Sequence, residues 1–441
     1  MRKFILILIV SSLVLTCKNL DNADPAPRNT FIKFYEGPYS ITTTSIQKIP
    51  TGYVILGNMD TETEKGLQPQ TVLIETDHQG NRIGDFHFYD NIVSKAFKPI
   101  IKNGLVSNYI IVGNSVIVKS DAQQSANVEI TSLAVLIVKD SFEEDENKRK
   151  LLSDRSNKEI KDDLFAGSVN ITNTGGFVVL GTFKEGLVNQ QNAPAEQLLW
   201  GFDVNLDSAW LKKYPLLQNT YSNAKSIHQT KGNFIWASAI ADVQGDFISS
   251  YVAIPFVQEQ SVPVNFSTIG ETTSQRFLPR DIQPAASPEF GYGVVGTYSE
   301  SIDGSKGNVF FMRVATDGTI INGSDRYFDG LASFTATVDK NSSQLIDSGE
   351  AITSTNDGGF ILVGTVTNAN TRDKDLLLIK VNSVGDLVWI KKRGGSGDEI
   401  PTGVVEAENG DLVVAGTSSV TIGRYSTVFL MRMDKNGELK N

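Results

Sequence analysis

Seven copies of one short pattern recur along the chain, each a glycine-containing turn followed by an apolar run that ends in glycine or another small residue. The copies are residues 52–57, 109–113, 176–181, 233–237, 291–296, 359–364 and 411–416. Their spacing of roughly 50 to 70 residues is close to that of propeller-type repeats. A unit of this size cannot bury its own apolar face, so the copies must stack on one another.

The repeats predict an all-β chain that forms a single β-propeller, most simply of seven four-stranded blades. The sixth copy shows the plan of one blade, with 350–354 as the inner strand and 360–364 as the second. Residues 375–381 and 387–392 are then its third and outer strands. Because the copies at 109–113 and 233–237 are degraded, six blades with an insertion domain, or eight blades, are the alternatives.

The two ends of the chain complement each other. The last copy stops at 437–441, without room for an outer strand, while residues 31–37 match the outer-strand pattern of 389–395. We therefore expect the N-terminal strand to complete the last blade, which would close the ring and remove two exposed edges. The alternative is a loose strand at the end of a tether.

The N-terminal residues have the composition of a targeting segment. Arg2 and Lys3 precede an apolar run at 4–15, which is too short to span a bilayer comfortably, and Cys17 is the only cysteine of the chain. Residues 18–29 are polar and aperiodic, as in a flexible tether. We therefore divide the chain into a signal peptide at 1–16, a tether at 17–29 and the propeller at 30–441.

Two resemblances bear on the cellular location. The segment 14–17 (Val-Leu-Thr-Cys) resembles a bacterial lipoprotein signal, although Thr16 stands where Gly, Ala or Ser is usual. This resemblance implies that Cys17 carries the lipid; a plain secretory signal is the alternative. The repeats, with Asp-Gly-Gly-aromatic at 357–360 and Gly-Thr at 364–365, resemble propeller lipoproteins of Bacteroidetes. That family implies a lipid anchor in the outer membrane, on either the cell surface or the periplasmic face.

Neither the composition nor the motifs indicate catalysis. The net charge of −10, without a cluster of Lys and Arg, argues against nucleic acid as a partner. His78, His87 and His228 are not at metal-ligand spacing, and the chain lacks the Gly-x-Ser-x-Gly and Gly-Lys-Ser/Thr motifs. We predict no catalytic, cofactor-binding or metal-binding residues and no cofactor, so that Cys17 is the one predicted site.

Several features have both a functional and a structural interpretation. The turn at 355–359 is superficially similar to the aspartate box of sialidases, and Glu406 with Glu408 could be the carboxylate pair of a glycosidase. We favour a plain turn and an alternating strand. The tryptophans are expected to pack between blades rather than stack on sugars; they are Trp200, Trp210, Trp236 and Trp389. The charged tract 140–163 is predicted to be a solvated, partly helical insertion.

These observations favour a non-catalytic binding or scaffold module that docks on a protein complex of the outer membrane. An alternative is capture of a glycan or peptide for a nutrient importer. A propeller hydrolase or lyase is a third, less favoured possibility, because it needs carboxylates or histidines that converge at the mouth of the channel. The sequence alone shows no such set.

Overall fold

A computed structural model describes residues 30–439, apart from 65, 122–125, 153–162, 185–194, 204, 216–219, 223–225, 231–233, 243–246, 255–264, 270–275, 300–305, 331–345, 369 and 420–424. The described elements are β-strands and one short 3₁₀ helix, Pro288–Phe290. Within the described residues, no helix is long and apolar enough to cross a membrane. Cys17, the signal peptide and the tether lie outside the described residues.

The strands between residues 42 and 269 form four sheets. Sheet 1 contains β2 (Thr42–Ile49), β3 (Gly52–Thr63), β4 (Gly66–Asp77) and β5 (His87–Asp90). Sheet 2 contains β6 (Val93–Lys102), β7 (Leu105–Asp121), β8 (Ala126–Lys139) and β9 (Glu144–Leu152). Sheet 3 contains β10 (Asp163–Ile171), β11 (Phe177–Lys184), β12 (Ala195–Phe202) and β13 (Ser208–Pro215). Sheet 4 contains β14 (Thr220–Ser222), β15 (Ile227–Gln229), β16 (Phe234–Asp242), β17 (Phe247–Ile254) and β18 (Asn265–Ile269).

The second half continues the same arrangement. Sheet 5 contains β19 (Arg276–Pro284), β20 (Tyr292–Ser299), β21 (Asn308–Val314) and β22 (Arg326–Phe328). Sheet 6 contains β23 (Ser348–Ser354), β24 (Phe360–Thr367), β25 (Lys374–Val381) and β26 (Leu387–Arg393). Sheet 7 contains β27 (Glu399–Glu406), β28 (Leu412–Ser418) and β29 (Thr427–Met433), and its fourth strand is β1 (Phe31–Tyr35). The described strands therefore form seven sheets, each with its strands antiparallel to their neighbours.

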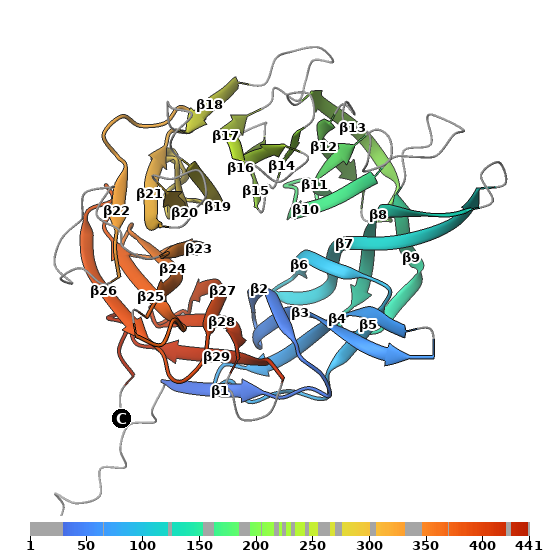
Figure 1. The fold of residues 1–441 in the computed structure, drawn as a ribbon, viewed down its shortest axis with the longest axis horizontal. Coiled ribbons are helices and arrows are strands. Elements are labelled where there is room, and N and C mark those ends of the chain that lie inside the picture. Colours follow the sequence, from blue (N-terminus) through green and yellow to red (C-terminus); the bar gives the residue numbers. More distant parts are fainter. Residues whose placement is uncertain are drawn as a thin grey trace, which may run out of the picture.

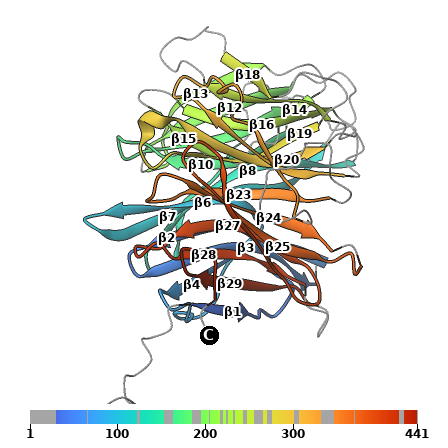
Figure 2. The same cartoon turned by 90° about the vertical axis from the view of Figure 1, so that its left-hand side faces the viewer.

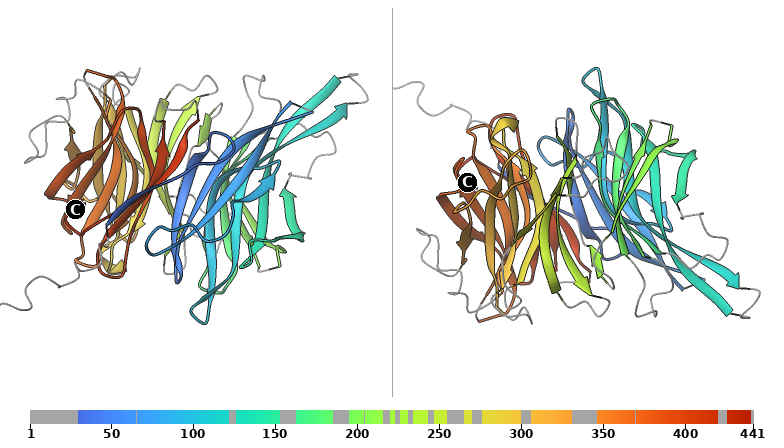
Figure 3. Two further views of the ribbon diagram at one scale, coloured as in Figure 1. Left: turned by 90° about the horizontal axis from the view of Figure 1, so that it is seen from below. Right: turned by 90° about the horizontal axis from the view of Figure 1, so that it is seen from above.

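The sheets are arranged radially around a central channel, with the first strand of each sheet innermost (Figure 1). Figure 2 shows the ring from its side, and Figure 3 shows the long β7–β8 hairpin extending beyond the neighbouring sheets. The predicted all-β propeller with four-stranded sheets is confirmed. In the sixth copy, the four strands fall within a few residues of the predicted positions.

The N-terminal strand lies at the outer edge of the last sheet. β1 pairs antiparallel with β29 from Phe31↔Arg432 to Tyr35↔Val428. The hydroxyl of Tyr35 also donates a 2.7 Å hydrogen bond to the carbonyl of Gly80, in the turn that follows the third strand of sheet 1. The first strand of the chain therefore contacts both the last sheet and the first.

The apolar core lies between neighbouring sheets. One cluster joins Ile111 of sheet 2 to Val54 of sheet 1, and another joins Phe311 of sheet 5 to Phe360 of sheet 6. Their side chains are fully buried, so each sheet covers the apolar face of the next. This is the stacking that the repeat predicts, because a single four-stranded unit leaves both of its faces open to water.

The interpretation of the tract 140–163 is wrong over much of its length. Glu144–Leu152 form β9, which pairs with β8 as the outer strand of sheet 2. A charged segment can form a strand here because an outer edge strand has solvent on one side and needs few apolar residues. Residues 153–162 lie outside the described residues.

Candidate functional site: the central channel

The inner strands of six sheets contain the same irregularity. In each, one extra residue forms a β-bulge against the second strand; these residues are Thr44, Lys95, Gly167, Arg280, Glu350 and Thr402. A bulge redirects the extra residue out of the regular alternation. All six residues line the central cavity.

The recurring glycine of the sequence lies opposite each bulge. The glycines are Gly57, Gly113, Gly181, Gly296, Gly364 and Gly416. A Cβ atom at these positions would lie 1.8 to 3.0 Å from a carbonyl oxygen of the inner strand, and the closest approach is Gly364 to Ser348. Glycine is therefore required where the bulged strand presses against its neighbour. In sheet 4, where the repeat lacks this glycine, the inner strand is divided into β14 and β15.

The cavity at the centre of the ring has a volume of about 470 Å³ and is lined by the inner strands of all seven sheets. Small residues directly after the bulges leave space for it. They are Ser45, Ala96, Ser168, Ala351 and Gly403, and Ser226 lines the cavity from sheet 4. In sheet 5, the residue after the bulge is Asp281.

Six charged or titratable side chains line this cavity. They are Lys95 and Lys98 from β6, His228 from β15, Arg280 and Asp281 from β19, and Glu350 from β23. Arg280 Nε lies 4.0 Å from a carboxylate oxygen of Glu350, so sheets 5 and 6 are joined by an ion pair at the channel. The hydroxyl of Ser348 donates a 2.9 Å hydrogen bond to the other oxygen of Glu350.

The carboxylate of Asp281 is held by the protein itself. One oxygen accepts a 3.1 Å hydrogen bond from the backbone N–H of Ile352, and the other accepts one of 3.3 Å from Gln283. Burial raises the pKa of Asp281 to about 6, against the lowering effects of Ile352, Ser226 and Lys98. Asp281 is therefore ionised at neutral pH, and its hydrogen bonds connect sheet 5 to sheet 6.

His228 and Lys98 each have a side-chain nitrogen without a hydrogen-bond partner among the residues that the structure describes. Burial lowers the pKa of His228 to about 3, and the charge of Lys98 lowers it further, so the imidazole is neutral. One ring nitrogen is hydrogen-bonded to the backbone of Ile282, whereas no described residue forms a hydrogen bond with Nε2. Burial also lowers the pKa of Lys98. No described residue forms a hydrogen bond or ion pair with its ammonium group.

His228 lies in an inner strand, as predicted from the sequence. The convergence of His228, Lys98 and Asp281 in the cavity was not predicted. An alignment of the inner strands could have revealed it. Lys98 and His228 each directly follow a buried apolar residue, Phe97 and Ile227, and so occupy the same place in their strands. The other two histidines lie away from the cavity, His78 in a turn and His87 in the outer strand β5.

The turn at 355–359 joins the first strand of sheet 6 to the second, as expected for a plain turn. Asp357 accepts hydrogen bonds from Gly359 N–H (3.0 Å) and from the ammonium group of Lys380 (2.7 Å). Glu406 accepts a 2.8 Å bond from the N–H of Asn356. Glu408 is exposed, and its carboxylate lies 3.9 Å from Lys48. These carboxylates have structural partners and lie outside the channel lining.

The tryptophans also lie away from the cavity. The ring centroid of Trp210, in sheet 3, is 6.1 Å from that of Phe234, in sheet 4. Trp389, in sheet 6, lies against Gly437, which follows the last strand of sheet 7. Both therefore pack between neighbouring sheets, as predicted. Trp236 is fully buried, and Trp200 donates a 2.8 Å hydrogen bond to Ser208.

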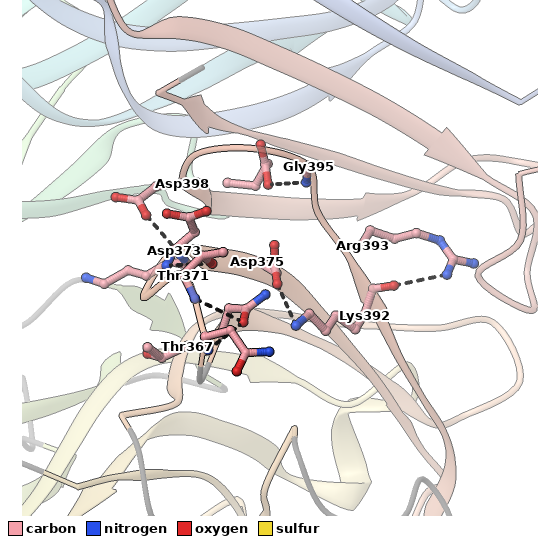
Figure 4. Close-up of polar contacts among 12 residues, drawn as sticks. Thr367, Thr371, Asp373, Asp375, Lys392, Arg393, Gly395 and Asp398 are labelled. Atoms are coloured by element: carbon pink, nitrogen blue, oxygen red, sulfur yellow. Dashed lines mark hydrogen bonds and ion pairs between the residues drawn. The ribbon is translucent and has the colours of Figure 1, made fainter. Parts of the chain in front are cut away.

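A second polar cluster lies where the loops of sheet 6 meet the start of sheet 7 (Figure 4). Asp375 forms a 2.5 Å ion pair with Lys392, and Asp398 accepts a 2.9 Å hydrogen bond from the N–H of Lys374. Glu399 accepts one of 3.1 Å from the N–H of Gly395. Because these carboxylates are already bonded, the cluster stabilises the loops, and no set of ligands suited to a metal ion occurs within the described part of the chain.

Comparison with known proteins supports the fold alone. No family model and no curated protein matches the chain. The polysaccharide lyase Uly1 is similar in structure, with a TM-score of 0.51 and 7% sequence identity over 91% of each chain. An α-L-arabinofuranosidase of Fusarium graminearum has a TM-score of 0.44 and 11% identity, over 79% of this chain and 95% of that one. The β-propeller domain of the Trilobed protease from Pyrococcus furiosus has values of 0.41 and 10%, over 92% and 96%.

Proposed function

We propose that this protein is a non-catalytic binding module of the bacterial envelope, anchored by a lipid on Cys17. Its ligand is a small polar molecule, such as a fragment of a glycan or a peptide, that enters the central channel. The observation behind this proposal is the cavity of about 470 Å³, which has the size of a small-molecule site. Polar atoms of its lining have no hydrogen-bond partner among the described residues. Capture of such a ligand would suit an accessory protein of a nutrient importer.

The proposal includes the way the ring is anchored. Each of the seven sheets acts as one blade of a closed ring, and β1 closes that ring through its pairing with β29. Since β1 directly follows the predicted tether at 17–29, the lipid would hold the propeller by its last blade. Either the cell surface or the periplasmic face of the outer membrane is compatible with this arrangement.

Ligand screening with a blocked channel tests the proposal. The ligand-free protein is titrated calorimetrically with neutral and acidic oligosaccharides and with short peptides. Thr44→Trp replaces a half-buried bulge residue of the cavity lining with a bulky indole and should abolish binding, whereas the exposed Ala286→Trp should leave it unchanged. Incubation of each bound ligand, followed by chromatography, should recover it intact. Equal binding by wild type and Thr44→Trp would refute the channel as the site, and cleavage of the ligand would refute the non-catalytic role.

A second candidate function is the docking of an outer-membrane protein on this propeller as a scaffold. The observation that favours it is the apolar hairpin between β6 and β7, where Ile101 is 52% and Leu105 is 67% exposed. Affinity capture from detergent-solubilised envelopes with the tagged full-length protein should then recover a stoichiometric partner. Ile101→Ser with Leu105→Ser should lose this partner but retain ligand binding in the channel. Capture that is unaffected by the double variant would remove the hairpin as the docking site.

A further inference from the structure

We infer that the channel ligand carries an acidic group next to a hydroxyl, as acidic sugars and other hydroxy acids do. Lys98 binds the acidic group, and Nε2 of His228 accepts a hydrogen bond from the hydroxyl. This inference rests on the proposed function, since it names the chemical class of the ligand that enters the channel. Three observations support it: the state of Lys98, the balance of charge in the cavity and the state of His228.

Lys98 is a cation without a hydrogen-bond or ion-pair partner in the described part of the chain. Its side chain lines the cavity, yet no described residue offers its ammonium group a hydrogen bond or an ion pair. The nearby carboxylate of Asp281 influences it electrostatically, but that carboxylate is already bonded to Ile352 and Gln283. Lys98 is half-buried, and a partly desolvated cation without a counter-ion is unfavourable for stability. An anionic ligand would supply the missing counter-ion.

The cavity also differs in charge from the rest of the chain. It is lined by three cations, Lys95, Lys98 and Arg280, and by two carboxylates, Asp281 and Glu350, which leaves one positive charge. The chain as a whole has a net charge of −10. Because Arg280 is paired with Glu350, the excess positive charge lies on β6, where Lys95 also lacks a described partner. A concave site of this sign attracts anions and repels cations.

His228 adds a requirement for a hydroxyl. Its imidazole is neutral, and because the other nitrogen is engaged by the backbone of Ile282, the free Nε2 can act only as an acceptor. Lys98 and His228 line the same cavity, so one ligand can contact both. A ligand that presents an acidic oxygen to Lys98 and a hydroxyl to His228 satisfies both groups.

The test uses the lipid-free protein from residue 18 onwards and three matched probes: D-galacturonate, its methyl ester and D-galactose. Calorimetric titration should show galacturonate binding at least about tenfold more tightly than the two neutral probes, since a charge-assisted hydrogen bond is lost in each of them. Lactate is a hydroxy acid without a sugar ring, so its binding distinguishes a site for hydroxy acids in general from a site for acidic sugars. Tight binding of lactate indicates a general hydroxy-acid site, and weak binding of lactate indicates an acidic sugar.

Two substitutions assign the acidic group to Lys98. Lys98→Met should lower the affinity for galacturonate about tenfold or more, while Lys98→Arg, which keeps the charge, should retain most of it. Lys102→Met is the matched control, because Lys102 is an exposed lysine on the same strand and lies outside the cavity. Lys98→Met should also leave the melting temperature of the ligand-free protein unchanged or raise it, which a structural lysine would not do.

The outcomes separate this inference from the proposed function. If the neutral probes bind as tightly as galacturonate and Thr44→Trp abolishes the binding, the channel is a ligand site but the inference about charge is wrong. If galacturonate binds equally to wild type and Thr44→Trp, the channel is not the site. If Thr44→Trp abolishes binding but Lys98→Met leaves it unchanged, the assignment of the acidic group to Lys98 is wrong. If none of the acidic probes binds, the inference is refuted whatever the other ligands do.

Discussion

Lys380 and Arg432 occupy the same place in the third strands of sheets 6 and 7, and each reaches back to the first turn of its own sheet. Lys380 binds Asp357 at 2.7 Å, and Arg432 binds Asp411 at 3.0 Å. The sequence predicts the turns from their Asn, Asp and Gly residues. The sequence does not show that Lys380 and Arg432 are the partners of these turns. Lys380 lies next to a turn more than twenty residues earlier only because the strands pair.

This ion pair predicts how stability depends on pH. Desolvation alone would raise the pKa of Asp357, but hydrogen bonds from Lys380, Thr355 and Gly359 lower it from 3.8 to about 2. Because the folded-state value is depressed, the stabilisation is complete above pH 3.8 and is lost as the pH falls towards 2. After allowance for solvent screening of this exposed carboxylate, we expect a contribution of about 1 kcal/mol.

Chemical denaturation of wild type and Asp357→Asn at pH 6 and pH 2 measures this contribution. The variant should be less stable than wild type by about 1 kcal/mol at pH 6. The two proteins should converge at pH 2. Asp60→Asn, which removes an exposed carboxylate from β3, serves as the control and should follow the wild-type curve. A difference between Asp357→Asn and wild type that persists unchanged at pH 2 would contradict the assignment.

At the scale of elements, the bulge of the inner strand and the glycine of the second strand form one unit. The sequence shows the glycine as the end of each repeat, but it gives no sign of the bulge, because an extra residue in a strand leaves the composition unchanged. Sheet 4 shows how the two depend on each other. Its repeat has Ala237 and Ser238 where the others have glycine, and its inner strand is interrupted between β14 and β15.

We therefore expect Gly364→Ala to be strongly destabilising although its backbone conformation is ordinary. The new Cβ atom would lie 1.8 Å from the carbonyl oxygen of Ser348, so the inner strand must move. Overpacking of this kind lowers the free energy of unfolding by about 3 kcal/mol. Gly395→Ala is the control, since its Cβ atom meets only Glu399 at 4.0 Å. Urea denaturation measures the free energy of unfolding of both variants. Equal stability of the two would show that the inner strand can move away without an energetic cost.

At the scale of the whole molecule, β1 makes the first and last parts of the chain interdependent. Removal of residues 1–36 exposes the edge of β29 and deletes the hydrogen bond from Tyr35 to Gly80. We expect the melting temperature to fall by about 5 °C or more and the protein to associate through its open edge. Removal of residues 1–29 leaves β1 in place and is the control. Calorimetry with light scattering distinguishes the two, and identical behaviour would mean that β1 contributes nothing to the ring.

Much of the architecture follows from local sequence. Glycine, asparagine and aspartate fix the turns, and apolar runs between turns can only be strands that stack on neighbouring copies. This is why the strands of sheet 6 and the pairing of 31–35 with the last sheet could be predicted. The charged strand β9 could not be, because its strand conformation comes from the open edge of β8 and not from its own residues.

The candidate site was decided by tertiary structure. Lys98, His228 and Asp281 are more than fifty residues apart from one another in sequence, and each is unremarkable within its own strand. The radial arrangement of the sheets brings these strands to one cavity, where burial and proximity give the side chains their altered pKa values. A local pattern can encode a strand, but which inner strands line one cavity depends on how all the sheets pack against one another.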